Sequence, residues 1–350
     1  MRLALLLASA WLFGCRPVPA AVAVPEVGPC AVVDGPNAVK RRAVLARLEA
    51  AGTSPRFFSG QNVGHASYEV DRALLTATKA ATGQTPVVMG LDLGYGGLSV
   101  TDAQLDSFVT LAVEHSAAGG LVTVSLHPDN PITGGDVRDL TFNHVGNLLT
   151  PGAPGFDAWQ RVLERTAQFL TTLKEQGVVV LFRPLHEMNG DWWWWRVQSP
   201  DDFKALWRGL HRDFEARGLD NLLWVYAPNF RQYDAQFPSD ELAPYPGDAC
   251  VDVVAPDAYF EVASVVNAQG SIDKLLTLGK PFGFAETGPS KQKADGSFDG
   301  LEVAKLKTLV PRAAYFVMWH SFWNGKLAIV DVKNGRELME HDAVRTLERP

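Results

Sequence analysis

Eight short apolar segments, separated by longer amphipathic ones, constrain the fold of this chain more than any other feature of its sequence. The apolar segments are rich in Val, Leu and Phe without clean alternation, as expected for strands that are buried on both faces. Helical periodicity in the intervening stretches predicts repeated strand–helix crossovers. We expect strands at 56–59, 86–91, 121–126, 178–182, 222–226, 251–255, 281–285 and 313–318, and helices at 68–82, 102–115, 157–176, 202–217 and 301–309.

This order of elements predicts an α/β fold, a (β/α)8 TIM barrel, built as a single domain over residues 36–350. A doubly wound parallel sheet is the structural alternative. It is disfavoured because no Gly-rich dinucleotide-binding loop follows the first strand, where the chain reads Ser59-Gly60-Gln61-Asn62. A barrel predicts that functional residues lie just after the C-terminal ends of its strands.

The N-terminus is typical of an exported protein. A positively charged start precedes an apolar stretch from Leu3 to Phe13, which is too short to span a bilayer but suits a signal peptide. Leu12-Phe13-Gly14-Cys15 resembles the lipobox of bacterial lipoproteins, in which the Cys is lipidated. We therefore expect a signal peptide at 1–14, a lipid anchor at Cys15 and a tether at 15–35. Ordinary cleavage near residues 21–23 is the alternative.

Export also bears on the remaining cysteines, Cys30 and Cys250. An oxidising compartment permits a disulfide between them, and two separate buried thiols are the alternative. The chain has 32 Lys and Arg against 39 Asp and Glu, a net charge of −7, which disfavours nucleic-acid binding. No later segment is long and apolar enough for a transmembrane helix. We expect a monomer that meets the membrane only through the lipid at Cys15.

Two glutamates follow predicted strands at the same end of the barrel. Glu187 lies in the segment 183–190 after the fourth strand, and Glu286 follows the seventh strand. Hydrolysis of a glycosidic bond requires such a pair: one protonated carboxyl donates a proton to the leaving oxygen, and one ionised carboxylate attacks the sugar or activates water. The alternative role for either Glu, taken alone, is structural: it would form a salt bridge or cap a helix.

Tryptophans gather beside the same strand ends. Of the ten Trp, four form the run 192–195 after the fourth strand, and Trp319 and Trp323 follow the eighth. The flat C–H faces of sugars pack on aromatic rings, so the cluster favours a carbohydrate site. Neighbouring side chains in an extended segment point in opposite directions. We therefore expect one or two of the four to line the cleft and the others to pack beneath it.

The segment Arg183-Pro184-Leu185-His186-Glu187-Met188-Asn189-Gly190, with its Trp run, resembles glycoside hydrolase family 26, a family of retaining barrel enzymes. Further segments resemble the family in the same order along the chain. They are residues 86–92, 126–131, 224–229, 245–259, 286–288 and Trp319, so that the resemblance covers roughly 56–325.

The resemblance implies that Glu187 is the acid/base and Glu286 the nucleophile. It also implies that Tyr259 hydrogen-bonds the nucleophile. Four further side chains would bind sugar near the cleaved bond: His127, His186, Trp192 and Trp319.

Three charged residues are expected to support this site. Arg183 would orient the carboxylates at the barrel mouth, while Asp92 and Asp257 would serve as hydrogen-bond partners. We expect no metal ion and no cofactor.

The implied activity is endo-hydrolysis of β-1,4-mannosidic bonds in mannan or galactomannan by double displacement. Mixed-linked β-glucan and β-1,3-xylan are alternative substrates, and attack from chain ends is an alternative mode that would need a blocking loop within 134–154. A non-catalytic glycan-binding lipoprotein would not require both Glu187 and Glu286. A metal-dependent amidohydrolase using His127, His186 and His320 is the least favoured reading, because the first strand lacks the His-x-His pair of that class.

Overall fold

The computed structural model describes residues 25–31, 35–64, 68–95, 101–141, 144–229, 240–259, 269–290, 293–322 and 324–350. The predicted signal peptide at 1–14, Cys15, much of the tether and Trp323 lie outside the described residues. Within the described part of the chain, no helix has the length and apolar character needed to cross a membrane.

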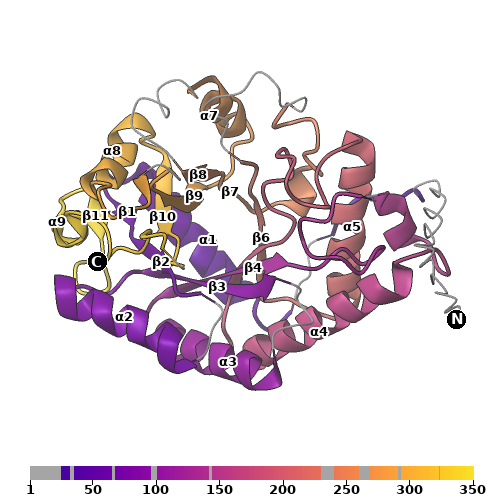
Figure 1. Ribbon diagram of the computed structural model, residues 1–350, viewed down its shortest axis with the longest axis horizontal. Helices are drawn as coiled ribbons and strands as arrows, with labels where there is room; N and C mark the ends of the chain where they lie inside the picture. The colour runs from indigo at the N-terminus through magenta and orange to yellow at the C-terminus, as the bar shows by residue number, and fades with distance from the viewer. Residues whose placement is uncertain are drawn as a thin grey trace, which may run out of the picture.

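Parallel strands close into a barrel, which confirms the predicted fold (Figure 1). Closure follows from the pairing of β10 with both β9 and β2. The strands of the ring are β2 (Gly60–Asn62), β3 (Val88–Tyr95), β4 (Leu121–His127), β5 (Val180–Arg183), β6 (Leu222–Tyr226), β7 (Val253–Val254), β9 (Phe282–Gly288) and β10 (Ala313–Met318).

Three short strands extend the ring. β1 (Phe57–Phe58) precedes β2 and pairs with β10, and β11 (Val344–Arg345) pairs with β1. β8 (Asp257–Tyr259) follows β7 and pairs with β9, which places Asp257 opposite Glu286.

Helices surround the barrel (Figure 1). The five predicted helices are present to within two residues at each end, and Ser199 caps α5 by accepting a hydrogen bond from the backbone N–H of Asp202 at 3.4 Å. The outer helices are α2 (Tyr68–Thr82), α3 (Asp102–Ala117), α4 (Phe156–Glu175), α5 (Pro200–Ala216), α7 (Gln269–Leu276), α8 (Leu301–Leu309) and α9 (Gly335–Glu340), with short 3-10 helices η1 (Val145–Leu149) and η2 (Asp248–Cys250).

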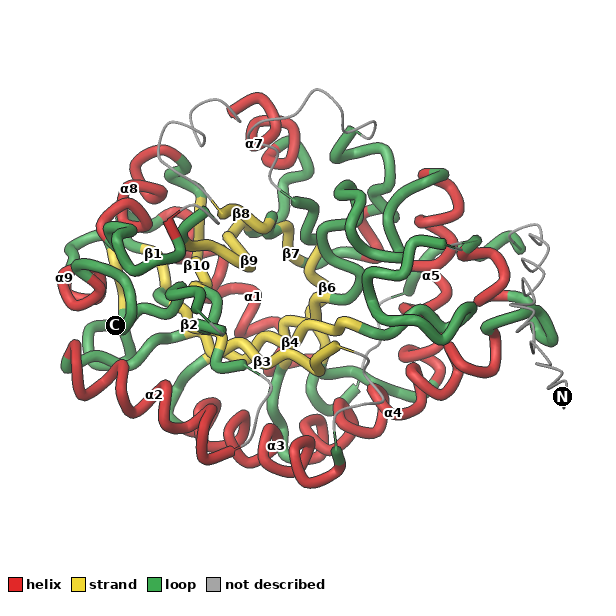
Figure 2. Tube along the Cα trace, in the orientation of Figure 1, coloured by secondary structure: helices red, strands yellow, loops and turns green. Residues whose placement is uncertain are grey.

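Three helices were not among the predicted elements: α7, α9 and α1 (Ala38–Thr53). α1 is the longest of the three. It is seen through the ring of strands in Figure 2. Its Leu48 and Ala51 are fully buried in a core cluster with inward-facing residues of the strands, including Phe58 and Leu223. The helix therefore closes the N-terminal end of the barrel, opposite the C-terminal strand ends. Its narrow apolar face explains why its sequence gave a weak helical signal.

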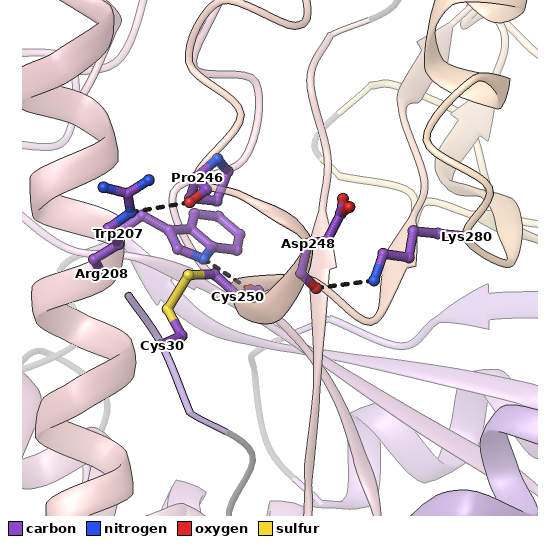
Figure 3. The surroundings of a disulfide bond; sticks show 7 residues. All are labelled: Cys30, Trp207, Arg208, Pro246, Asp248, Cys250 and Lys280. Atoms are coloured by element: carbon purple, nitrogen blue, oxygen red, sulfur yellow. Dashed lines mark hydrogen bonds between the residues drawn. A yellow bond between two sulfur atoms is a disulfide. The ribbon is translucent and has the colours of Figure 1, made fainter. Parts of the chain in front are cut away.

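A disulfide joins Cys30 to Cys250 across 220 residues of sequence (Figure 3). The indole N–H of Trp207 on α5 donates to the carbonyl oxygen of Cys250 at 3.1 Å, so the bond lies against that helix. Of the two alternatives for these cysteines, the structure therefore shows the disulfide and not two separate thiols. It ties the N-terminal segment 25–31 to the loop that leads into β7.

Candidate active site

The polar residues of the predicted site gather at the C-terminal ends of the strands. Asp92 lies in β3, His127 ends β4 and Arg183 ends β5, while β8 carries Asp257 and β9 carries Glu286. β9 runs to Gly288, beyond its predicted end, so Glu286 lies within the strand and not after it. All these side chains are buried.

Glu286 is held by two donors of different kinds. Tyr259 Oη donates to Glu286 Oε2 at 2.7 Å, and Arg183 Nη2 donates to Glu286 Oε1. Arg183 Nη1 donates to Asp257 Oδ2 at 2.7 Å, so one guanidinium bridges the two carboxylates. Burial alone would lower the pKa of Arg183, but the charges of Asp257 and Glu286 outweigh it and raise that pKa. Arg183 therefore remains a cation that balances this buried pair.

Tyr259 stays a hydrogen-bond donor to Glu286. Burial, followed by the negative charge of Glu286, raises the pKa of Tyr259 well above its ordinary value. A phenol that keeps its proton fixes the orientation of one carboxylate oxygen. The other oxygen is fixed by Arg183, which leaves Glu286 with little freedom to rotate.

Glu187 follows β5 in a strained turn. Leu185 and Glu187 both have positive φ angles, 49° and 52°, which non-glycine residues seldom adopt and which cost roughly 1–3 kcal/mol each. The backbone N–H of Glu187 donates to the carbonyl oxygen of Ala227 at 2.7 Å and holds the turn against the end of β6. The turn directs the carboxyl group toward the barrel mouth.

Three neutral N–H groups surround the carboxyl group of Glu187. The indoles of Trp192 and Trp193 donate to Oε2 at 2.7 and 3.1 Å, and the Asn229 amide donates to Oε1 at 2.8 Å. Burial, followed by the charge of Glu286, raises the pKa of Glu187, whereas the hydrogen bonds from Asn229 and Trp192 lower it in part. Since the raising effects dominate, Glu187 favours the protonated form that a general acid needs.

Three further side chains are functional candidates to which the sequence patterns assigned no individual role: Asn189, Trp193 and Asn229. The Asn189 amide donates to the Asn229 carbonyl oxygen at 2.9 Å, and the Asn229 backbone N–H donates back to Asn189 Oδ1 at 2.6 Å. This reciprocal pair aims the Asn229 side chain at Glu187. The sequence did contain a signal for both Asn residues, because they lie in segments that resemble glycoside hydrolase family 26. Asn189 lies in 183–190 and Asn229 in 224–229.

Two histidines form an ordered row with Asp92. His127 Nδ1 lies 2.8 Å from Asp92 Oδ2, and its Nε2 lies 3.0 Å from His186 Nε2. Because a carboxylate only accepts hydrogen bonds, a neutral His127 carries its proton on Nδ1 and accepts from His186 through Nε2. Burial, followed by the positive charge of Arg183, lowers the pKa of His186 well below its ordinary value, so this ring is neutral.

His186 is buried within this row. Its Nε2 faces His127 and lies 3.9 Å from Glu286 Oε1, and its Nδ1 is buried with no partner among the described residues. The side chain of His186 is only 1% exposed. Sugar binding by His186 remains a prediction. Sugar binding by His127 remains a prediction.

The Trp run divides into one partly exposed ring and three buried ones. Trp192 is partly exposed, whereas Trp193, Trp194 and Trp195 are buried. The indoles of Trp194 and Trp195 donate to the carbonyl oxygens of Pro128 and His186, both at 2.7 Å, and so support the floor of the site. Trp319, after β10, is also partly exposed, and its ring centroid lies 6.4 Å from that of His127. Sugar binding by Trp192 and Trp319 remains a prediction.

Three potential metal ligands, His186, Asp257 and Glu286, lie within 4.8 Å of one another in the described part of the chain. The position of a cation between the two carboxylates is taken by the Arg183 guanidinium, which donates to both. The third histidine of the alternative amidohydrolase site is His320. Its Nδ1 forms a hydrogen bond with Asn62 Oδ1 at 2.8 Å. These residues are therefore arranged as an ion-pair network.

Comparison with known proteins agrees with this geometry. The family model described as glycosyl hydrolase family 26 matches residues 34–344. A mannan endo-1,4-beta-mannosidase of Bacillus subtilis is 36% identical over 280 residues, covering 75% of this chain and 74% of that protein. Another from Bacillus subtilis strain 168 is 33% identical over 307 residues, covering 83% and 80%.

The structural comparison points the same way. The solved structure of Bacillus subtilis mannanase man26 superposes with a TM-score of 0.76 at 29% identity, covering 91% of this chain and 96% of that one. The similarity to this family is therefore not confined to the segment 183–190 but extends over residues 34–344. The protein belongs to glycosyl hydrolase family 26.

Proposed function

We propose that this protein is an endo-β-1,4-mannanase that cleaves mannan or galactomannan with retention of configuration. The observation that carries the proposal is the contrast between two buried glutamates at one barrel mouth. Glu187 is surrounded by neutral N–H donors and has a raised pKa, whereas Glu286 is bound by the Arg183 cation and the Tyr259 phenol. One carboxyl group favours its proton, and the other is placed to act as an anion.

In the first step, a carboxylate oxygen of Glu286 attacks the anomeric carbon. The bond to the leaving oxygen breaks as Glu187 transfers its proton to that oxygen, and a covalent glycosyl-enzyme forms. Among the described residues, Glu187 Oε2 accepts two indole N–H groups, whereas Oε1 accepts one N–H, from the Asn229 amide. The proton is therefore best carried by Oε1.

In the second step, Glu187 is ionised and accepts a proton from water as that water attacks the anomeric carbon. The bond to Glu286 breaks, the carboxylate is regenerated, and the product leaves with its original configuration. The hydrogen bonds from Trp192, Trp193 and Asn229 stabilise the ionised form of Glu187 between the two steps.

The mannan substrate is supported by the relatives named mannan endo-1,4-beta-mannosidase. The experiment that tests it is product analysis of the purified protein on β-mannan, galactomannan, mixed-linked β-glucan and β-1,3-xylan. We expect cleavage of the two mannans, with products of several lengths from the earliest times. Preferential cleavage of either other glycan would overturn the substrate, and a single short product from the outset would overturn endo action.

We further propose that the protein is exported, that Cys15 is lipidated after removal of residues 1–14, and that the catalytic domain is a monomer. The apolar stretch 3–13 and the lipobox-like Leu12–Cys15 support this. So does the Cys30–Cys250 disulfide, because such bonds persist in oxidising compartments. The full-length protein should fractionate with membranes and Cys15→Ser should not. Equal distribution of both would contradict the anchor, and light scattering of the domain should give the mass of one chain.

A further inference from the structure

The helix α1 carries a strip of small apolar side chains on its solvent-facing side. Val39 is 67% exposed, more than any other large apolar side chain among the described residues. Ala43, Ala46 and Ala50 are also exposed, and they share its face because the four positions recur at intervals of three or four residues. Side chains this small allow the helix to approach a flat surface closely.

Basic residues flank the apolar strip. α1 contains four cations and a single acidic residue, Glu49, in a chain whose net charge is −7. Helical periodicity places Arg42 on one edge of the strip, and Lys40 and Arg47 on the other. All three of these cations are exposed. The outer face of α1 is therefore positive, opposite in sign to the chain as a whole.

Cations at this end of the barrel bind neutral oxygen atoms. Lys40 Nζ and Arg47 Nη2 donate to backbone carbonyl oxygens at 3.2 and 3.1 Å, and Arg345 Nη2, in β11, donates to a serine hydroxyl at 3.1 Å. In the described part of the chain none of these three forms an ion pair, whereas Arg336 on α9 is paired with Glu340 at 2.9 Å. Their charges are therefore not neutralised within the domain.

Like charges also crowd one another around Phe58. The guanidinium carbons of Arg47 and Arg345 lie 5.7 and 5.9 Å from the centroid of its ring. Burial, followed by the positive charge of Arg56, lowers the pKa of Arg345. Burial, followed by the charge of Arg345, lowers the pKa of Lys307 to about 8. The closed end of the barrel, formed by α1 and the N-terminal ends of the strands, therefore has a positive potential that an anionic surface would complement.

The chain enters the domain on the side of this closed end. The disulfide joins Cys30 to Cys250, which lies ahead of β7. The backbone and side-chain amides of Asn37 donate to the two carboxylate oxygens of Asp220, ahead of β6, both at 2.9 Å. Both contacts involve segments that precede strands, and α1 begins at the next residue after Asn37. The segment before α1 is therefore fixed to the closed end.

The predicted lipid anchor is close to this entry point along the chain. The described segment 25–31 begins ten positions after Cys15. Ten residues span at most about 36 Å when fully extended. A compact domain of this length has a radius of gyration of about 20 Å and is about 50 Å across. Because the tether is shorter than the domain is wide, it holds the closed end nearer to the bilayer than the active-site mouth.

We propose that the outer face of α1 docks on an anionic phospholipid surface, with Lys40, Arg42 and Arg47 against the headgroups. The inference rests on the lipid anchor at Cys15, which is part of the proposed function, and adds a second membrane contact to that lipid. The anchor keeps the domain near the bilayer, and the basic face orients it. The active-site mouth, at the opposite end of the barrel, then points away from the bilayer toward a long polysaccharide.

The first test measures binding without the anchor. Purified Cys15→Ser protein is sedimented with phosphatidylglycerol vesicles at low ionic strength, where weak electrostatic binding is measurable. We expect the further change Arg42→Gln to weaken binding by about fivefold, the effect of one cation near an anionic surface. Arg42→Lys keeps the charge and should bind as well as the parent protein. Arg336→Gln removes the same charge from α9 and is the matched control, with unchanged binding.

The second test measures orientation in the anchored protein. A fluorophore on Ala46→Cys marks the outer face of α1, and one on Asp129→Cys, which follows β4, marks the mouth. The lipid on Cys15 and the disulfide leave no other thiol to label. Quenchers on the headgroups of phosphatidylglycerol vesicles should quench the first probe and not the second. Salt near 1 M should remove this difference, because it screens the charges.

Three outcomes would overturn the docking surface. They are unchanged binding after Arg42→Gln, an equal loss after Arg336→Gln, and equal quenching of the two probes. The second would indicate a response to net charge alone. Wild-type protein that does not stay with the vesicles would instead overturn the lipid anchor. The sedimentation test still decides the docking surface in that case, so the two failures are distinguishable.

Discussion

The surroundings of Glu187 and of Glu286 differ in the charge of their hydrogen-bond donors. Glu187 lies in a turn after β5, and its donors in the described part of the chain are neutral N–H groups, from two indoles and one amide. Glu286 lies within β9 and accepts from the Arg183 cation and the Tyr259 phenol. Both carboxyl groups are buried, so burial alone cannot assign their roles. The charge of the donors separates an acid from a nucleophile.

The largest effect is expected from Glu286→Ala, which removes the nucleophile. Turnover of mannan should fall at least about 10⁴-fold, since no other group can form the covalent intermediate. Added azide should restore turnover of an activated aryl mannoside and give a glycosyl azide, detectable by mass spectrometry. Retention of normal activity in this variant would refute the assignment of Glu286.

Glu187→Ala should have a substrate-dependent effect. On mannan, loss of the proton donor should lower kcat/KM by about 10²–10⁴-fold. On 2,4-dinitrophenyl β-mannobioside the first step needs little protonation, so the loss in that step should be much smaller. Pre-steady-state release of dinitrophenol measures it directly. Equal losses in this step on both substrates would show that Glu187 is not the acid.

Tyr259→Phe tests the support of the nucleophile. Removal of one hydrogen bond to a charged group costs about 1.5–3 kcal/mol, which corresponds to a fall in kcat of about tenfold to a hundredfold. Tyr315→Phe is a matched control, because the Tyr315 hydroxyl is buried in the barrel with no partner among the described residues. Similar losses of kcat in both variants would point to general packing and not to the Glu286 contact.

Trp192→Phe should produce the smallest change, a shift in the pH profile. Activity requires protonated Glu187 and is lost as pH rises through its pKa. The indole N–H stabilises the ionised form and lowers that pKa, so its removal should move the alkaline limb upward by about half a unit to one unit. Trp194→Phe loses an indole that bonds Pro128 instead and should not move the limb. A shift of the alkaline limb in Trp194→Phe but not in Trp192→Phe would contradict the role of the Trp192 indole in setting the pKa of Glu187.

Much of the fold could be predicted because its signals are local. Seven of the eight predicted apolar segments overlap strands of the ring, whereas the first, 56–59, coincides with β1 and the ring strand β2 begins one residue after it. The Ser199 cap with Pro200 fixed the start of α5. These signals reside in a few adjacent residues. α1 escaped prediction because only a narrow face of it is buried, and that face is complemented by residues from several strands. Its helical state depends on packing against partners distant in sequence.

The same division applies to the site. Local sequence patterns were sufficient to place Glu187, Glu286 and the Trp run at or near the C-terminal ends of strands. Contacts between distant segments set the rest: Asn229 faces Glu187, Arg183 bridges Asp257 and Glu286, and His186 faces His127. These contacts join residues 42 to 103 positions apart. Strand order and register bring such residues together, and no local pattern records which atoms then meet.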